Sequence, residues 1–198
     1  GSGDTLYGGS GNDSLNGGSG NDSLDGGSGI DTAHYNGKPS NYTLGKSGNY
    51  YTLADTLGND GEDTLVNIER LNFSNGADIA IDTGVGEIGG SSYRIYKAAF
   101  NRTPDEGGLG YWIGQMDLGM DLVDVSARFI DSDEFRAAYG TNPSNGEFLT
   151  KVYNNVLGRD PDSGGYDWWV DQLANNPEKS WDKVLADFSE SSENVENT

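Results

Sequence analysis

The first part of the chain repeats a nine-residue pattern of apolar, acidic and glycine positions. Leu6, Leu15 and Leu24 share this period, and an Asp stands two positions before each of them. Three units, GGSGNDSLN, GGSGNDSLD and GGSGIDTAH, fill residues 8–34 after a partial unit, GDTLY. Each x-L-x triplet predicts a short strand with its Leu inward, and each glycine-rich half predicts a turn. The pattern therefore predicts a coil of short strands over residues 1–35.

The acidic positions of this coil predict a metal site. Two nine-residue units make one turn of a parallel coil, so residues 18 apart stack, which pairs Asp4 with Asp22 and Asp13 with Asp31. Carboxylates and turn carbonyls together can give a calcium ion the six or more oxygens that it takes. Glycine is required where the backbone has positive φ or approaches an ion closely. The candidate metal residues are Asp4, Asp13, Asp22, Asp31, Gly9, Gly11, Gly18, Gly20, Gly27 and Gly29.

Three Leu side chains cannot stabilise this segment alone, because ordering each residue costs ~1.5 kcal/mol. We therefore expect a disordered apo segment whose folding energy comes from metal binding. A flexible Gly/Ser linker is the alternative that composition suggests, but a linker has no reason to keep Asp and Leu in register. The last unit has Ala33 in place of Leu, where we expect the coil to fray or to be capped.

These repeats resemble those of RTX (repeats-in-toxin) proteins, whose nonapeptides form calcium-filled parallel β-rolls. The resemblance covers residues 1–35 closely. It implies export through a type I secretion system, with the chain unfolded in the calcium-poor cytosol and folding outside. The implied location is secreted or on the bacterial cell surface.

Residues 36–83 alternate apolar and polar positions as strands do. The segment is similar to the one that often closes an RTX roll, which predicts a β cap whose strands cover the open end. Asp60 and Asp63 could hold one more ion, but we favour a turn with a polar surface. The expected core residues are Leu65, Ile68, Leu71 and Phe73.

A second, longer repeat follows residues 84–92, GVGEIGGSS, which predict a Gly/Ser hinge. YKAAFNRTPDEGGLGYWIGQM (96–116) aligns without gaps to YNNVLGRDPDSGGYDWWVDQL (153–173). Each copy predicts a helix, an R-x-P-D-x-G-G turn and another helix, so residues 93–198 predict a duplicated all-α domain of roughly six helices. The pattern resembles the domain of unknown function DUF4214, which often accompanies RTX repeats and brings no activity with it.

The two turns of this repeat have a structural interpretation. Asp105 and Asp162 each stand just before a helix, where a carboxylate caps free backbone amides. Arg102 and Arg159 lie three residues earlier and are expected to pair with that Asp or with helix carbonyls. An EF-hand in the second copy is excluded because Gly164 would occupy a ligand position.

The helix after each turn carries adjacent aromatic residues. Trp112 and Trp169 fall on the apolar stripe and are predicted as core. Tyr111 and Trp168 lie ~100° from it, each with Gln four residues later and Gly three residues before. A ring beside an amide could bind a sugar or peptide; we favour the alternative that this face packs two helices together, with Gly permitting close approach. The candidate ligand-binding residues are Tyr111, Gln115, Trp168 and Gln172.

Composition narrows the function classes. The net charge is −20, from 32 acidic and 12 basic residues, which argues against nucleic acid and favours hard cations. There is no Cys, and no apolar run approaches the ~20 residues of a membrane span, so no membrane insertion is expected. The single His34 is expected on the strand surface, and no catalytic motif appears, so catalysis is not expected. The opening Gly1-Ser2, without Met, suggests a fragment of something longer.

The sequence thus predicts a parallel β-roll with a β-strand cap, followed by an all-α duplicated helical domain. The function that we favour is a calcium-dependent, non-catalytic extracellular module of a bacterial adhesin or surface protein. It would present a helical ligand-binding domain, with extracellular polysaccharide as the candidate partner. The alternatives are an accessory substrate-binding module of a secreted polysaccharide-active enzyme and a purely structural cap or surface-layer module.

Overall fold

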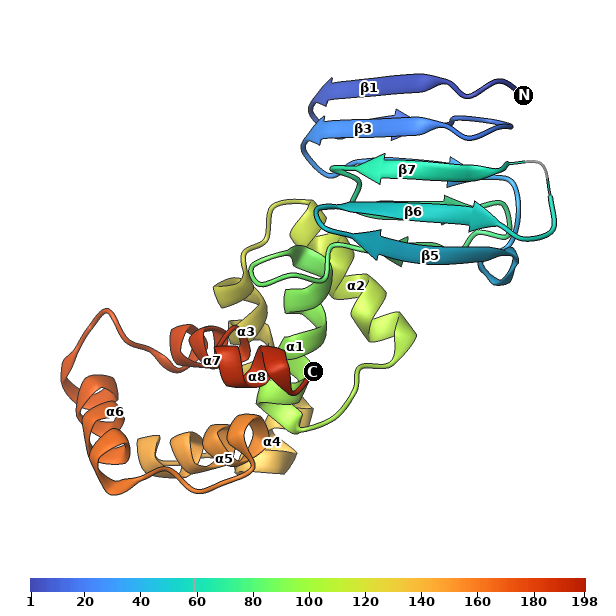
Figure 1. Cartoon of the computed structure of the whole chain (residues 1–198). Helices are drawn as coiled ribbons and strands as arrows, with labels where there is room; N and C mark the ends of the chain where they lie inside the picture. The colour runs from blue at the N-terminus through green and yellow to red at the C-terminus, as the bar shows by residue number, and fades with distance from the viewer. Residues whose placement is uncertain (59) are drawn as a thin grey trace. The chain divides into compact units, whose positions relative to one another are not determined.

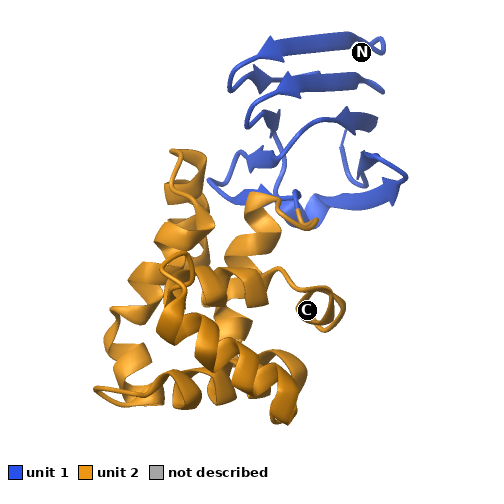
Figure 2. Ribbon diagram, turned by 90° about the vertical axis from the view of Figure 1, so that its left-hand side faces the viewer, with its two compact units in different colours: residues 1–82 blue, residues 83–198 orange. Residues whose placement is uncertain are grey.

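Strands occupy the first part of the chain and helices the second (Figure 1). The computed structural model describes residues 1–58 and 60–198. These residues form two compact units, 1–82 and 83–198 (Figure 2). The predicted order, a β region followed by a helical region, is confirmed.

The strands of the first unit are short, as the nine-residue period requires. Several of them end in or beside the glycine-rich turns. The described strands are β1 (Thr5–Ser10), β2 (Ser14–Leu15), β3 (Ser23–Ser28), β4 (Thr32–Tyr35), β5 (Tyr42–Ser47), β6 (Tyr50–Asp55), β7 (Glu62–Val66), β8 (Arg70–Phe73) and β9 (Asp78–Ala80), with a short helix, η1 (Pro39–Asn41), before β5.

These strands form two sheets, in the orders β1-β3-β7-β6-β5 and β2-β4-β8-β9; Figure 1 shows the first as a ladder. Pairing is parallel between β1, β3 and β7, and between β2, β4 and β8. Pairing is antiparallel where β5, β6 and β9 join. Both sheets are therefore mixed, so the prediction of a parallel roll describes only the side that carries the repeats.

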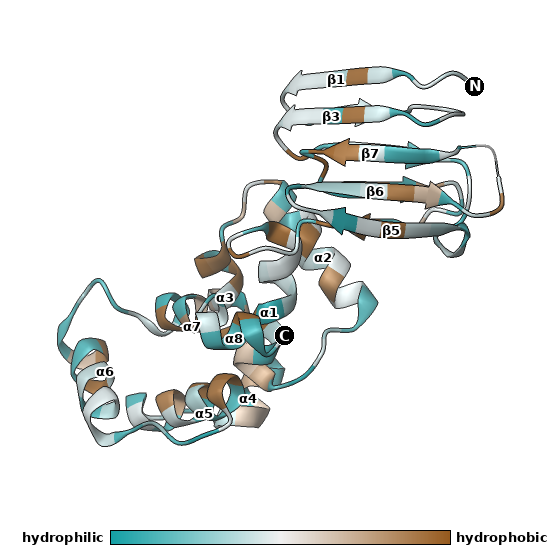
Figure 3. Cartoon of the chain, viewed as in Figure 1, coloured by the Kyte–Doolittle hydropathy of each residue, from teal (hydrophilic) through white to brown (hydrophobic). Residues whose placement is uncertain are grey.

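Apolar residues form ladders across the parallel strands, and Figure 3 shows a hydrophobic band on each of β1, β3 and β7. The two ladders are Leu6–Leu24–Leu65 and Leu15–Ala33–Leu71. Ala33 is buried and pairs with Leu71 of β8, so the sheet continues at this position and the expected fraying does not occur. The core predicted for this region is confirmed by the burial of Leu65, Ile68, Leu71 and Phe73.

The second unit contains eight helices among the described residues, more than the six or so predicted. The additional ones are short: α4 begins after Ser132 and α8 after Ser191, and each Ser accepts a hydrogen bond from a backbone amide of the helix. The helices are α1 (Ile88–Phe100), α2 (Glu106–Asp117), α3 (Leu122–Ile130), α4 (Asp133–Tyr139), α5 (Asn145–Leu157), α6 (Ser163–Asn175), α7 (Trp181–Ser189) and α8 (Ser192–Glu196).

The prediction of a hinge over residues 84–92 is wrong from Ile88 onward, where α1 begins. The guanidinium of Arg94 donates to the carbonyls of Thr83 and Gly84 at 3.1 and 2.8 Å. This arginine is buried, so the chain before α1 is held against the helix by hydrogen bonds that a free hinge would lack.

The two halves of the helical unit repeat the same contacts between aromatic rings. In each half, a Tyr of the first helix and a Trp of the second meet a Phe of the third. The centroid distances are 4.8 Å for Tyr96–Phe129 and 5.4 Å for Trp112–Phe129, against 5.0 Å for Tyr153–Phe188 and 5.6 Å for Trp169–Phe188.

Candidate metal centre and helical surface

The repeat aspartates stack in two columns, with the predicted pairs adjacent. The backbone amide of Asp4 donates to Oδ1 of Asp22 at 2.7 Å. The amide of Asp13 donates to Oδ1 of Asp31 at the same distance of 2.7 Å. Each contact joins residues 18 apart, so the coil brings the side chain of one turn against the backbone of the preceding turn.

The second oxygen of these carboxylates is left without a partner. Oδ2 of Asp13, Asp22 and Asp31 is buried and accepts no hydrogen bond from the described residues. The side chains of Asp22 and Asp31 are 3% and 0% exposed. An uncompensated buried carboxylate costs several kcal/mol unless it is protonated, paired or bound to a cation. Hard oxygen donors in a water-poor turn fit calcium.

The six predicted glycines all have the backbone conformation that the turns require. Their φ angles lie between 86° and 139°, which residues with a Cβ rarely adopt. The first glycine of each unit, Gly8, Gly17 or Gly26, was not among the predicted metal residues. A Cβ on Gly17 would lie 2.3 Å from Oδ2 of Asp22, so the missing side chain leaves room for the carboxylate. The doubled glycine of each GG pair was the signal for this close approach.

Both columns extend beyond the nonapeptides. The amide of Asp22 donates to Oδ1 of Asp63 at 2.9 Å, and the amide of Asp31 donates to Oε2 of Glu69 at 2.8 Å. Burial raises the pKa of Asp63 to about 6 and also raises the pKa of Glu69. The favoured interpretation of Asp63 as part of a polar turn surface is wrong, since this side chain is 2% exposed. Glu69 was not predicted, and its carboxylate acts here as a hydrogen-bond acceptor for the amide of Asp31.

Side chains alone do not complete a metal site here. Within the described residues, no three His, Cys, Asp or Glu side chains form a group that could hold an ion. Carbonyl oxygens of the glycine turns would therefore have to join the Asp carboxylates as ligands, which is the combination that the sequence predicts.

His34 is a half-buried strand residue between two polar neighbours. Its Nδ1 lies 3.1 Å from Oδ1 of Asn72, and its Nε2 lies 2.9 Å from Oγ of Ser14. An amide oxygen can only accept, so Nδ1 carries the proton and Nε2 accepts from the serine. The side chain of His34 thus links neighbouring strand residues by hydrogen bonds, and it lies on a strand as expected.

In the turns of the helical repeat, the predicted Asp caps are present, but the arginine of the first turn has a different partner from the one expected. Asp105 and Asp162 cap α2 and α6, each accepting from a backbone amide at 2.8 Å. The expected partner of Arg102 is wrong, because this arginine forms an ion pair with Glu134 of α4 at 2.6 Å. The carboxylate of Glu134, 32 residues away in sequence, accepts hydrogen bonds from Nε and Nη2 of Arg102. The neighbouring Asp105 instead accepts from the backbone amide that it caps.

The aromatic residues of α2 and α6 face solvent at equivalent positions. Tyr111 and Trp168 are 57% and 52% exposed, and each ring packs edge-on against the following Trp. The favoured interpretation, that these rings pack two helices together, is therefore wrong. The glycines do permit close approach, but on another side: a Cβ on Gly108 would lie 2.5 Å from the hydroxyl of Tyr96.

The two glutamines beside these rings are half-buried. Oε1 of Gln172 accepts from the side-chain amide of Asn176 at 2.8 Å at the end of α6. The predicted core residues Trp112 and Trp169 are only partly buried against the helical core, since α2 and α6 each contact it along one side.

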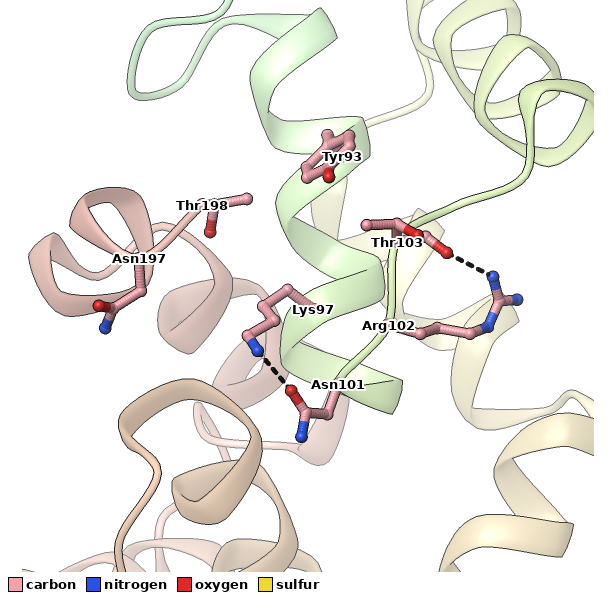
Figure 4. A pocket seen from close by; sticks show the side chains of 7 residues that line it. All are labelled: Tyr93, Lys97, Asn101, Arg102, Thr103, Asn197 and Thr198. Carbon is pink, nitrogen blue, oxygen red and sulfur yellow. Dashed lines mark hydrogen bonds between the residues drawn. The ribbon is translucent and has the colours of Figure 1, made fainter.

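A polar pocket in the helical unit has its own hydrogen bonds (Figure 4). Lys97 donates to Asn101, and Arg102 donates to the carbonyl of Thr103 at 2.9 Å. Its described lining includes no Asp or Glu side chain. The lining residues are Tyr93, Lys97, Asn101, Arg102, Thr103, Asn197 and Thr198. None of the described helices is both long enough and apolar enough to cross a bilayer.

Models of known protein families match both ends of the chain. The RTX calcium-binding nonapeptide repeat (4 copies) matches residues 1–33, and the domain of unknown function DUF4214 matches residues 126–198. The chain joins RTX repeats to a DUF4214 region. RTX repeats bind calcium and are typical of extracellular proteins, and neither family is a catalytic one.

Among solved structures, one similar chain is the crystal structure of the extracellular lipase LipA from Serratia marcescens, with 27% identity and a TM-score of 0.23. The similarity covers 36% of this chain and 13% of the lipase chain, so this chain spans a small part of that protein's length. No curated protein sequence matches this chain.

Proposed function

We propose that residues 1–82 form a calcium-dependent β-roll in an extracellular module of a bacterial adhesin or surface protein. The observation that carries the proposal is the set of buried carboxylate oxygens without partners, at Asp13, Asp22 and Asp31. Water would have solvated these oxygens in the unfolded chain, and no described protein group replaces it. A divalent cation would compensate the buried charge and offset the loss of hydration.

The chain's own residues explain why folding would depend on the cation. Without one, the like charges of Asp4 and Asp22, and of Asp13 and Asp31, are drawn together across adjacent turns. The apolar ladders are short, and the glycines of the turns lose much conformational entropy on folding. Calcium, when bound, supplies the positive charge between the turns. The roll is then expected to be unfolded in a calcium-poor cytosol and folded outside the cell.

Circular dichroism under calcium titration tests this proposal on the whole chain. We expect β-sheet signal to appear with calcium and to disappear with chelator, while the helical signal remains. The double variant Asp13→Asn/Asp22→Asn keeps acceptor oxygens but removes two charges, and should require at least tenfold more calcium. Glu62→Gln, an exposed acid near the columns, is the matched control. An identical spectrum of the parent protein in calcium and in chelator would sink the proposal.

A second candidate function concerns the helical unit, which we propose binds an extracellular carbohydrate. The favouring observation is the pair of exposed aromatic rings at equivalent positions, Tyr111 and Trp168. Large exposed rings cost solvation, and they are suited to stacking on the apolar face of a sugar ring. Each ring is held edge-on by its neighbouring Trp, so little side-chain entropy remains to be lost on binding.

A further inference from the structure

Residues 60–66 continue the repeat after an insertion. Their sequence, DGEDTLV, has the same order of glycine, acid and Leu as SGNDSLD at residues 19–25. β7 pairs with β3 in parallel register, with Leu65 opposite Leu24. The separation is therefore 41 residues where the nonapeptides have 18, so 23 residues are inserted between the two turns. Asp63 follows Asp22 in its column just as Asp22 follows Asp4.

The backbone contacts of a repeat pair recur in this later pair. Between nonapeptides, the amide of Asp13 donates to Oδ1 of Asp31 at 2.7 Å, and the carbonyl of Asp13 accepts from Thr32 at 2.9 Å. Between Asp22 and the later segment, the corresponding distances are 2.9 Å to Asp63 and 2.8 Å from Thr64.

The side-chain contact that joins two repeat turns recurs as well. Oδ1 of Asn12 accepts from the amide of Ile30 at 3.0 Å in the nonapeptides. Oδ1 of Asn21 accepts from the amide of Glu62 at 3.1 Å in the later pair. A side-chain oxygen of an equivalent Asn therefore bridges adjacent turns in both places.

The glycine of the later turn is also equivalent. Gly61 has a φ of 81°, and a Cβ there would lie 2.3 Å from the carbonyl oxygen of Gly20. At the matching repeat position, Gly29 has a φ of 139° and a Cβ would lie 2.2 Å from the carbonyl oxygen of Gly11. Both the positive φ and the close backbone approach of a repeat turn are thus retained after the insertion.

The charges between these turns are uncompensated. Oδ2 of Asp22 is buried without a partner, and Asp63 is 2% exposed. The ion pairs within the described residues leave both carboxylates without a basic partner. Two buried carboxylates in adjacent turns, without a basic partner, call for a cation.

We propose that a calcium ion binds between residues 17–22 and residues 60–63, with Asp22 and Asp63 as its charged ligands. Turn carbonyls complete the coordination, as in the nonapeptides. The ion joins the last nonapeptide turn of this column to the chain that follows the insertion. This site lies beyond residue 33, where the RTX match ends. It rests on the proposed function, because it uses the same cation.

The other column ends differently and provides a control. There Asn67 stands opposite Gly26 and Glu69 opposite Asp31, so three residues replace the six of a repeat turn. The shortened turn lacks the glycine carbonyls of a repeat. The column of Asp13 and Asp31 therefore gains no ion from Glu69.

Calcium stoichiometry of the whole chain, measured by native mass spectrometry and titration calorimetry, tests the proposal. The variant Asp63→Asn keeps the acceptor for the Asp22 amide and should bind one ion fewer than the parent protein. Glu62→Gln and Glu69→Gln should bind the parent number. An unchanged count and affinity in Asp63→Asn overturns this site, as does an ion lost from Glu69→Gln alone. A parent protein that binds no calcium overturns the proposed function itself.

Should Asp63→Asn fail to fold, a crystal structure of the parent protein grown with calcium decides the question. Anomalous density between Asp22 and Asp63 supports the site. Calcium density in the nonapeptide turns, with none between these two residues, overturns it while leaving the proposed function intact.

Discussion

The role of a single side chain can be predicted from the sequence when its partner is local, but not when its partner is distant along the chain. The carboxylates of Asp105 and Asp162 could be assigned as helix caps from sequence, because a cap depends on residues within one turn of the helix. The partner of Arg102 could not, because Glu134 reaches it only after two intervening helices have folded. The exposure of Tyr111 was hidden for the same reason: a helical pattern shows which residues share a face, but not what covers that face.

The exposed ring of Trp168 leads to a prediction at this scale. Trp168→Ala should weaken binding to a glycan array about two- to tenfold, since a stacked ring contributes about 0.5–1.5 kcal/mol. The free energy of unfolding should change by less than about 1 kcal/mol, because half of the ring already lies in solvent. Leu118→Ala, which removes an exposed apolar side chain from the end of α2, should leave binding unchanged.

Tyr111→Ala and Trp168→Ala should be measured in parallel, in millimolar calcium and again with chelator. A loss of several kcal/mol of stability in Trp168→Ala would show that the ring is structural, and the ligand hypothesis would then be abandoned. An array on which the folded parent protein binds nothing would likewise exclude carbohydrate as the ligand.

For the strands and helices, the period of the sequence repeat predicted the structure better than the expected boundaries of the elements did. The nine-residue period predicted β1 to β4 and the stacking of residues 18 apart, because the same turn chemistry recurs at each glycine pair. β7 and β8 belong to the same sheets, but the insertion changes the spacing and Asn67 replaces a glycine, so no fixed period points to them. The start of α1 was missed because buried glycines, packed closely against backbone, look in sequence like those of a flexible linker.

The anchoring of α1 gives a prediction about stability. Glu190 accepts two hydrogen bonds from the buried Arg94, at 2.9 and 2.7 Å, and one from the amide of Gly86. Glu190→Gln leaves the arginine charge buried without its counter-ion, and should lower the free energy of unfolding by about 3 kcal/mol. Glu193→Gln, at an exposed pair whose atoms are 3.9 Å apart, should change it by less than about 0.5 kcal/mol.

Guanidinium melts followed by Trp fluorescence measure this effect in the right part of the molecule, because all four Trp residues lie within 83–198. Equal effects of Glu190→Gln and Glu193→Gln would contradict the role assigned to the buried pair. Raised salt should weaken the small contribution of Glu193 and change that of Glu190 little, since buried pairs are poorly screened.

The described residues of the whole molecule form two hydrophobic cores, one in each unit. The helical core contains large buried side chains such as Phe148 and Leu149, whereas the β core rests on ladders of single Leu and Ala residues beside uncompensated carboxylates. The stability of the first unit should therefore depend on calcium and that of the second should not. Composition alone indicated this division, since glycine and Asp dominate the first part and helix-forming and aromatic residues the second.

Calorimetry of the whole chain can separate the two units. With calcium we expect two unfolding transitions, of which only the one accompanied by loss of β-sheet signal moves with calcium concentration. Binding to the folded state alone stabilises it by about 2.7 kcal/mol per site when free calcium is a hundred times the dissociation constant. With two or three sites the shift should be large, and chelator should abolish that transition while the Trp-reported one stays in place.

Magnesium should not replace calcium, because irregular carbonyl-rich turns do not meet its strict octahedral demand. A single transition that moves as a whole with calcium would mean that the helical unit also depends on the ion, so that the stabilities of the two units are not independent.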